Sequence, residues 1–458
     1  MYSNIPQPKY LLKKVIRVME SRVNENEQVQ ARDIAFLLFL TFLNVINYID
    51  RQLIGVFANW IVPELDLSNF EFGLITGPIF IFFYAVMGLF MGIIADRVNR
   101  TRLIAFGLGL WSFLTVLSGA AKGFLSMALP RMFIGVGEST LAPAAISLLG
   151  DRFPAKWQGF VVGIFGMGVS IGLGLSLLIV AYLEPILGWR GCFYLLGGMG
   201  IVLALCMLLM RETPRRHLGE MQKENDISTN KGLLDGFSFR TVALDLRNLM
   251  ASLPSLTATL VGSIVFTLVL GAATFDQLWF VQERGFDRNE IAQMIAWIAI
   301  SAGIIGNLFG GYGGDIFLRR TGIGRPYFLA LVMVILAPLI ITYRIVDPNS
   351  IWFWIGVFAI YFQIGCFYGP AFGTIADLVP SKKRGMVIGL TVLLIQILGA
   401  ALGAVTAGLM IDTFTKYGVS EPYSITLLIF TAISLLAIPI FVFAGRRFER
   451  DRQKMSEV

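Results

Sequence analysis

One pattern occurs twice in this chain, as DRFPAKWQGFVVG over residues 151–163 and as DLVPSKKRGMVIG over residues 377–389. The two copies align without a gap at their Asp, Pro, Lys and Gly positions. A shorter pattern also repeats, as GIIADRVNR over residues 92–100 and as GYGGDIFLRR over residues 311–320. Because the copies lie about half a chain apart, the sequence predicts two halves of the same design.

The chain is too apolar to fold around one water-soluble core. It has 458 residues, of which 56% are hydrophobic and 15% charged. Twelve apolar stretches are long enough to cross a bilayer, which takes about 20 residues each. Because lipid cannot satisfy backbone polar groups, such stretches cross as helices. We therefore predict an all-α membrane protein with spans near 34–61, 70–95, 103–121, 124–150, 158–182, 190–210, 255–281, 290–314, 326–345, 351–377, 386–411 and 423–444.

Hydrophilic segments divide the chain into five parts. We expect a cytoplasmic segment at 1–33, a six-helix bundle at 34–210, a cytoplasmic loop at 211–254, a second six-helix bundle at 255–445 and a cytoplasmic tail at 446–458. This topology places 29 of the 37 Lys and Arg residues on one side, six on the other and two within the membrane. The positive-inside bias then puts both termini in the cytoplasm, in the inner membrane if the protein is bacterial. The net charge of +7 is thus topological and indicates no nucleic-acid partner.

The inventory of reactive side chains argues against an enzyme. The single histidine, His217, lies in the central loop, and no span carries a metal-ligand set or a paired nucleophile and base. We expect no metal and no cofactor. The basic stretch at residues 9–22 is either an amphipathic helix on the inner leaflet or a disordered tail.

Two pairs of charged residues lie well inside apolar spans of the first half, Asp50 and Arg51 in the first span and Arg131 and Glu138 in the fourth. A charge near the bilayer centre costs about 2.5–3.5 kcal/mol on insertion scales, so such residues face a cavity or a partner. They either act directly in transport or lock two helices together.

The first span has one polar face. Asn44, Asn47, Tyr48 and Arg51 recur at steps of three and four residues, which is one face of a helix. We predict that this face lines a central cavity and binds substrate. Asp50 points about 100° away from Arg51 around the helix axis, toward a neighbouring helix.

The rise per residue of a helix gives the depth of each of these charges in the membrane. Asp50 and Arg131 fall near the same level, so we predict that they form an ion pair, with Glu138 deeper. Burial favours the protonated form of a carboxyl group. Since no span contains histidine, Glu138 and Asp50 are the candidates for proton coupling. The alternative for Glu138 is a static hydrogen bond to a tyrosine or asparagine.

The second half has no evident counterpart to these charges. Ile364 occupies the position that aligns with Glu138, and Phe367 and Tyr368 follow it. We predict that these two aromatic residues form the opposite, apolar wall of the cavity. Ordinary aromatic packing is the alternative.

The two short repeats carry candidate gating residues. Asp96, Arg97 and Arg100 follow the second span, and Asp315 and Arg319 follow the eighth. A carboxylate there can accept from helix N-terminal amides and from an arginine, forming a latch on the inner face. We predict that Asp96 reaches residues 384–386 when that face is closed. The alternative is an exposed loop with topological charges.

Two motifs carry a family resemblance. The Gly-x-x-x-Asp-Arg signature ending at Arg97, echoed near Asp315, resembles the major facilitator superfamily over residues 34–445. The resemblance implies two six-helix bundles related by a pseudo-twofold axis. The runs Asn47-Tyr-Ile-Asp-Arg-Gln52 and Arg131-x-x-x-Gly-Val-Gly-Glu138 resemble its spinster branch.

The spinster resemblance implies proton-linked, alternating-access transport of lysophospholipids or sphingoid lipids. A carrier of the same fold for a small organic anion or drug is the alternative. The segment 139–143 departs from the Ala-rich continuation typical of the branch, which affects substrate more than fold. We expect a monomer that contacts its substrate, protons and membrane lipids.

Overall fold

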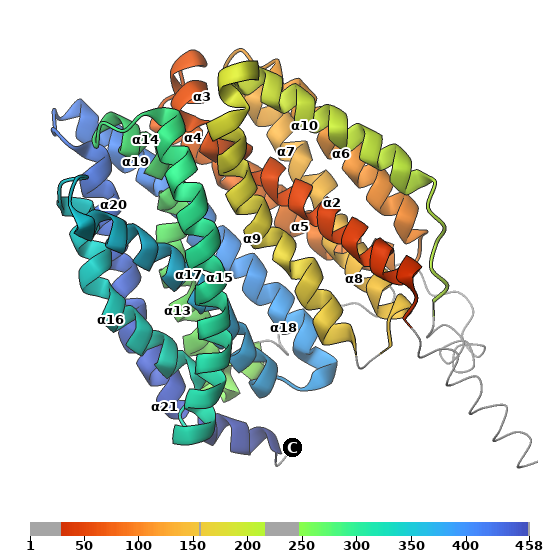
Figure 1. Ribbon diagram of the computed structural model, residues 1–458. Helices are drawn as coiled ribbons and strands as arrows, with labels where there is room; N and C mark the ends of the chain where they lie inside the picture. The colour runs from red at the N-terminus through yellow and green to blue at the C-terminus, as the bar shows by residue number, and fades with distance from the viewer. Residues whose placement is uncertain (1–28, 155–156, 216–246, 457–458) are drawn as a thin grey trace, which may run out of the picture.

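The computed structural model describes residues 29–154, 157–215 and 247–456. Within these residues, twelve helical segments are long and apolar enough to cross a membrane. The predicted all-α, twelve-helix fold is confirmed (Figure 1). The basic stretch at 9–22 and most of the central loop lie outside the described residues, although residues 247–252 of that loop are helical.

The first six spans contain nine helices. They are α2 (Ala31–Val56), α3 (Ala58–Glu64), α4 (Asn69–Thr76), α5 (Pro78–Ala95), α6 (Arg100–Gly119), α7 (Phe124–Glu138), α8 (Leu141–Arg152), α9 (Gln158–Tyr182) and α10 (Glu184–Leu208). Side-chain caps set several starts. Ser68 accepts from the Glu71 amide at the start of α4, and Asn99 accepts from the Arg102 amide at the start of α6.

The last six spans follow the same order. They are α13 (Pro254–Ala272), the 3₁₀ turn η2 (Ala273–Phe275), α14 (Asp276–Gln282), α15 (Arg288–Thr321), α16 (Arg325–Ile345), α17 (Ile351–Leu378), α18 (Ser381–Leu394), the π-helical turn η3 (Ile395–Ala401), α19 (Leu402–Lys416), α20 (Pro422–Leu435) and α21 (Ala437–Ser456). α15 continues beyond the predicted end at 314, and Gly322 ends it in the left-handed conformation with a φ of 70°.

Several spans are interrupted near mid-depth. The seventh changes to the 3₁₀ turn η2 before α14, and the eleventh widens into the π turn η3. The fourth breaks after Glu138, where α7 ends and α8 begins. Interrupted helices in transporters frequently mark the binding level, because they expose backbone groups and turn side chains inward.

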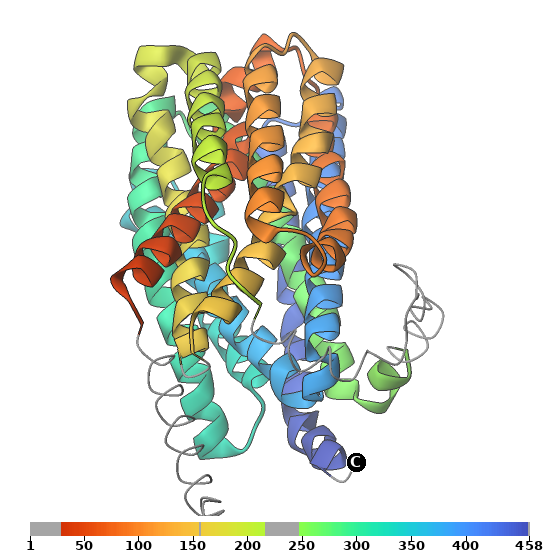
Figure 2. The ribbon, with the colours of Figure 1, turned by 90° about the vertical axis from the view of Figure 1, so that its right-hand side faces the viewer.

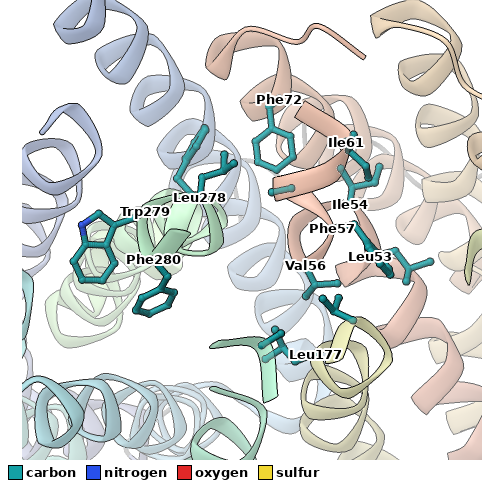
Figure 3. Packing of buried hydrophobic residues seen from close by; sticks show 14 of the residues in the cluster. Leu53, Ile54, Val56, Phe57, Ile61, Phe72, Leu177, Leu278, Trp279 and Phe280 are labelled. Carbon is teal, nitrogen blue, oxygen red and sulfur yellow. The ribbon is translucent and has the colours of Figure 1, made fainter. Parts of the chain in front are cut away.

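The two halves meet at one end of the molecule, which we call the closed end. There α3 and α4 lie beside α14 and α19 (Figures 1 and 2). A shared apolar cluster includes Phe57 and Phe72 from the first half and Leu278 and Trp279 from the second, as Figure 3 shows. The backbones of the two halves approach each other closely there, because a Cβ at Gly73 would lie 2.5 Å from the Ala404 carbonyl oxygen.

The opposite end, which we call the open end, is looser. Among the described residues, no atom lies within 4 Å of where a Cβ would stand at Gly92, Gly163 or Gly389. All three lie toward the open-end termini of their helices. The structure therefore represents one access state, in which the halves pack together at the closed end and also along α9 and α15, where Gly174 lies against Ile300.

Candidate functional site

The centre of the first half holds a buried ion pair between Arg51 and Glu138. Arg51 donates from Nε and Nη2 to Glu138 Oε2 at 3.1 and 3.0 Å. The side chains are 11% and 0% exposed. Glu138 is the last residue of α7, so the break in the fourth span delivers its carboxylate to α2. Breaking such a pair on one side costs about 3–5 kcal/mol, because the remaining charge is left buried.

Aromatic rings enclose the Arg51 guanidinium. Its central carbon lies 4.3 Å from the ring centre of Tyr84, 4.7 Å from that of Tyr48 and 5.3 Å from that of Phe80. Cation–π contacts of this kind stabilise a desolvated guanidinium by about 0.5–2 kcal/mol each. Arg51 is therefore held in place by more than its carboxylate partner and can lose that partner without leaving its site.

Arg131 lies on the same wall without a carboxylate bonded to it. Its Nη2 donates to the Arg51 carbonyl oxygen at 2.7 Å, and its guanidinium covers the Phe80 ring at 4.2 Å. Its Nε is buried and has no hydrogen-bond partner among the described residues. Arg131 thus supplies a buried positive charge with a spare donor.

Asp50 points away from this cluster, as predicted, toward a neighbouring helix. Thr115 of α6 donates its hydroxyl to the Asp50 carboxylate, 2.8 Å from both oxygens. The predicted Asp50–Arg131 ion pair is wrong in this structure, because Arg131 bonds to the α2 backbone instead. Two residues at the same depth on neighbouring helices need not face one another, because depth does not fix the direction in which each side chain points.

The polar residues of α2 have two different roles, since one packs helices together and another supports the site. Asn44 donates to the Phe165 carbonyl oxygen at 2.8 Å and packs on Gly168 of α9, so it joins two helices rather than lining the cavity as predicted. Asn47 Oδ1 accepts from Arg51 Nη2 at 3.4 Å and is itself buried. Asn47 supports the arginine from within the same helix.

The two aromatic residues predicted to form the cavity wall of the second half also lie in different environments. Phe367 is fully buried and stacks on Phe266 with ring centres 4.7 Å apart, so it packs helices together and does not form a cavity wall. Tyr368 is 46% exposed and stacks on Phe372 with ring centres 6.2 Å apart.

Two adjoining cavities lie between the halves. The first, of about 160 Å³, is lined by Arg51 and Arg131 on one side and by Thr274 and Gln396 of the interrupted spans on the other. The second, of about 250 Å³, reaches toward the closed end and is mostly aliphatic. The two share four lining residues, namely Gln52, Gly55, Leu270 and Thr274.

The sequence interpretation missed an ion pair in the second half. Arg344 Nη1 donates to Asp276 Oδ1 at 2.8 Å, and both residues line the larger cavity. Arg344 lies one residue before the expected end of its span, so it does not stand out in the sequence as an intramembrane charge. The signal was the occurrence of Asp276 within an otherwise apolar seventh span.

The candidate gating residues lie at the open end, where the second span ends and the third begins and where the eighth span ends. Asp96 and Arg97 are exposed. Arg100 is fully buried within the first half, where it binds Asp151 and donates to Glu212 Oε1 at 2.8 Å. In the part of the chain that the structure describes, the two halves are separated at the open end. The predicted contact of Asp96 with residues 384–386 therefore stays a prediction for the other access state.

The equivalent cluster in the second half is built around a different arginine from the one expected. Asp315 accepts from Arg325 Nε at 2.7 Å, and Asp377 accepts from Arg325 Nη1 at 2.5 Å. Arg319 is exposed one turn beyond Asp315. Arg325 and Arg100 are the first residues of α16 and α6, so the two halves repeat this arrangement.

Comparison with known proteins agrees with this architecture. The profile of the Major Facilitator Superfamily matches residues 40–404. The chain belongs to this superfamily. It is therefore a membrane transporter by family. An MFS-type efflux pump of Mycolicibacterium smegmatis is 25% identical over 90% of this chain and 92% of the pump.

Spinster proteins are among its relatives. Protein spinster of Drosophila melanogaster is 24% identical over 82% of this chain and 62% of its own length. A crystal structure of a bacterial homolog of the human lysosomal transporter Spinster, inward-facing and unoccupied, superposes with a TM-score of 0.79. The two chains are 23% identical, and the match covers 93% of this chain and 99% of that one. The fold and the resemblance to the spinster branch are thereby confirmed.

Proposed function

We propose that this protein is a proton-coupled secondary transporter for an amphipathic substrate with an acidic head group, of the lysophospholipid or sphingoid type. The observation that carries the proposal is the position of Arg51. Its guanidinium bonds to the buried Glu138 and also lines the central cavity. A head group that enters the cavity therefore meets the same cation that holds the carboxylate.

Charge balance links the proton to the substrate. Arg51, Arg131, Asp50 and Glu138 carry two positive and two negative charges when all are ionised. Three of them are buried, and the Arg51 side chain is only 11% exposed. A bound anion adds an uncompensated negative charge, and protonation of Glu138 or Asp50 removes one. Because isolated buried charges are costly, anion binding and protonation favour one another.

The shape of the site suits an amphiphile. The arginines lie beside the smaller cavity, while the larger one offers aliphatic side chains from both halves, such as Val56, Leu177 and Ile360. An acidic head at Arg51 and Arg131 would leave its apolar chain among them. The relatives that bear the spinster name, including a probable sphingolipid transporter of Arabidopsis thaliana that is 23% identical over 91% of this chain, support the same class.

The positive-inside bias indicates which side of the membrane the open end faces. Among the described residues, Arg97, Arg102, Arg319 and Arg320 are exposed at the open end. That end is therefore cytoplasmic in this proposal, and the closed end is external. The structure then corresponds to the inward-facing state of an alternating-access cycle.

A small organic anion is the second candidate, for one specific reason. A probable L-galactonate transporter of Escherichia coli is 31% identical over 183 residues, which are 40% of each chain. Arginines on both walls of the cavity, Arg51 and Arg344, would suit an acid with two polar ends.

The test is transport and binding in proteoliposomes. Glu138→Gln should abolish uptake driven by a pH gradient while leaving exchange partly intact, and Arg51→Ala should weaken binding itself. Glu290→Gln makes the same change at an exposed position and should behave as wild type. Full gradient-driven uptake by Glu138→Gln would assign that residue to structure alone. Thermal shifts with lysophospholipids and sphingoid phosphates, against dicarboxylates and sugar acids, separate the two substrate classes.

A further inference from the structure

The ion pair of the second half lies in the cavity next to Arg51. Asp276 and Arg344 line the larger cavity, which shares Gln52 and Thr274 with the cavity at Arg51. A molecule that extends from Arg51 toward the closed end therefore reaches this pair. Neither residue is used in the proton coupling proposed above.

The pair is built rigidly. Asp276 is the first residue of α14, directly after the 3₁₀ turn that interrupts the seventh span. The Arg344 guanidinium is held between Trp279 and Tyr343, whose ring centres lie 4.6 and 4.5 Å away. Arg284 donates to the Arg344 carbonyl oxygen at 2.6 Å, which fixes the end of α16 as well.

The pair also has unused hydrogen-bonding capacity. The Arg344 side chain is 2% exposed, yet its Nε has no partner among the described residues. The bond between the two residues engages Oδ1 of Asp276, and 17% of that side chain remains exposed beside the cavity. A buried donor without a partner costs about 1–3 kcal/mol, which a simple lock between α14 and α16 would not require.

We propose that Asp276 and Arg344 form a second substrate subsite, which binds a hydroxyl or ammonium group of the transported molecule. Asp276 accepts from that group, and Arg344 orients the carboxylate and neutralises it. This inference rests on the proposed function, since the acidic group of the same molecule lies at Arg51 and Arg131. The substrate is then bifunctional, with an acid at one wall and a hydrogen-bond donor at the other.

The test compares two probes that share the acidic group and the chain and differ only in added hydrogen-bond donors. One is a long-chain alkyl phosphate, and the other is a 2-amino-3-hydroxyalkyl phosphate of the same chain length. Binding of both to the full-length protein in nanodiscs is measured for wild type, Asp276→Asn and Arg51→Ala. A second pair, a linear dicarboxylate and its polyhydroxylated analogue, serves the organic-anion alternative.

We expect wild type to bind the donor-bearing member of one pair more tightly, and Asp276→Asn to reduce that preference about tenfold while affinity for the plain member stays unchanged. Arg51→Ala should weaken both members alike. The double variant Asp276→Asn with Arg344→Gln leaves no unpaired charge and should show the same lost preference. Asp347→Asn, exposed in the adjoining loop, is the matched control.

The outcomes separate the two proposals. An unchanged preference in Asp276→Asn overturns the subsite even if Arg51→Ala weakens binding. A lost preference together with normal binding by Arg51→Ala keeps the subsite and overturns the head-group role of Arg51. Equal affinity of wild type for both members of each pair, or binding of none of the four probes, overturns the subsite.

Discussion

Asp412 connects the two halves at the closed end and should control how long that end stays shut. It lies on α19, and its Oδ1 accepts from the Asn69 backbone amide at 3.1 Å and from Asn69 Nδ2 at 2.8 Å. Its Oδ2 accepts from the Phe70 amide at 2.8 Å. These amides are the first of α4, so a carboxylate of one half caps a helix of the other. Tyr423 adds a bond from its hydroxyl to Asn69 Oδ1 at 2.8 Å.

Asp412→Asn keeps the shape of the side chain but removes its charge and one acceptor oxygen. A hydrogen bond to a charged group contributes about 1.5–3 kcal/mol net, and the helix N-terminus adds about 0.3–1 kcal/mol. Because Asp412 is partly exposed and the amide oxygen still accepts one bond, we expect a loss of about 2 kcal/mol. This changes the ratio of closed to open populations about thirtyfold.

Spin labels report this change directly. Ile186 and Tyr417 are 77% and 78% exposed at the closed end, one in each half, so cysteines placed there can be labelled without disturbing the interface. Cys206 is the exposed native cysteine among the three and is replaced by Ser in this background. Asp412→Asn should lengthen the distance between the two labels in a large share of molecules.

The matched control is Asp66→Asn. Asp66 is exposed just before α4 and has a φ of 51°, which asparagine also adopts. It should leave the distance distribution as in wild type. If Asp412→Asn also leaves it unchanged, the cap does not hold the closed end together, and the apolar cluster alone accounts for closure.

Two further predictions concern packing. Gly73→Ala would bring a Cβ to 2.5 Å from the Ala404 carbonyl oxygen, so it should open the same end in the spin-label assay, whereas Gly150→Ala has free space at its Cβ and should not. Arg100→Ala removes a fully buried cation that binds two carboxylates, so the midpoint of thermal unfolding in detergent should fall by several degrees, for a loss of about 3–5 kcal/mol. Arg102→Ala is exposed on the same helix and should change that midpoint little; equal melting of the two variants would contradict the buried role of Arg100.

The sequence predicts the fold well because membrane insertion leaves few choices. Span length, the duplicated Asp-x-x-Pro patterns and the distribution of basic residues each constrain the fold independently, and they agree. Charged residues in apolar spans likewise identify Arg51, Glu138 and Arg131, which the structure brings to one wall of the cavity. The cost of burying a charge is what makes these positions visible without coordinates.

Partner assignment does not follow from the same signals. Helical period gives the direction of a side chain only for a regular helix, and the fourth and seventh spans break at Glu138 and just before Asp276. Arg131 has a long side chain that reaches the α2 backbone instead of the nearest carboxylate. Thr115, the partner of Asp50, is a common residue in membrane helices and gives no sequence signal of its own.

The breaks themselves explain how a rigid fold presents its polar groups. An unbroken helix would keep Glu138 and Asp276 in line with their neighbours, whereas a helix end or a 3₁₀ turn places each beside an arginine from another helix. η3 adds Gln396 to the cavity in the same way. Arg51 lies on one half, and Asp276 and Arg344 lie on the other. A molecule held by both walls would therefore join the halves across the cavity, and closure around it would follow from its own two polar ends.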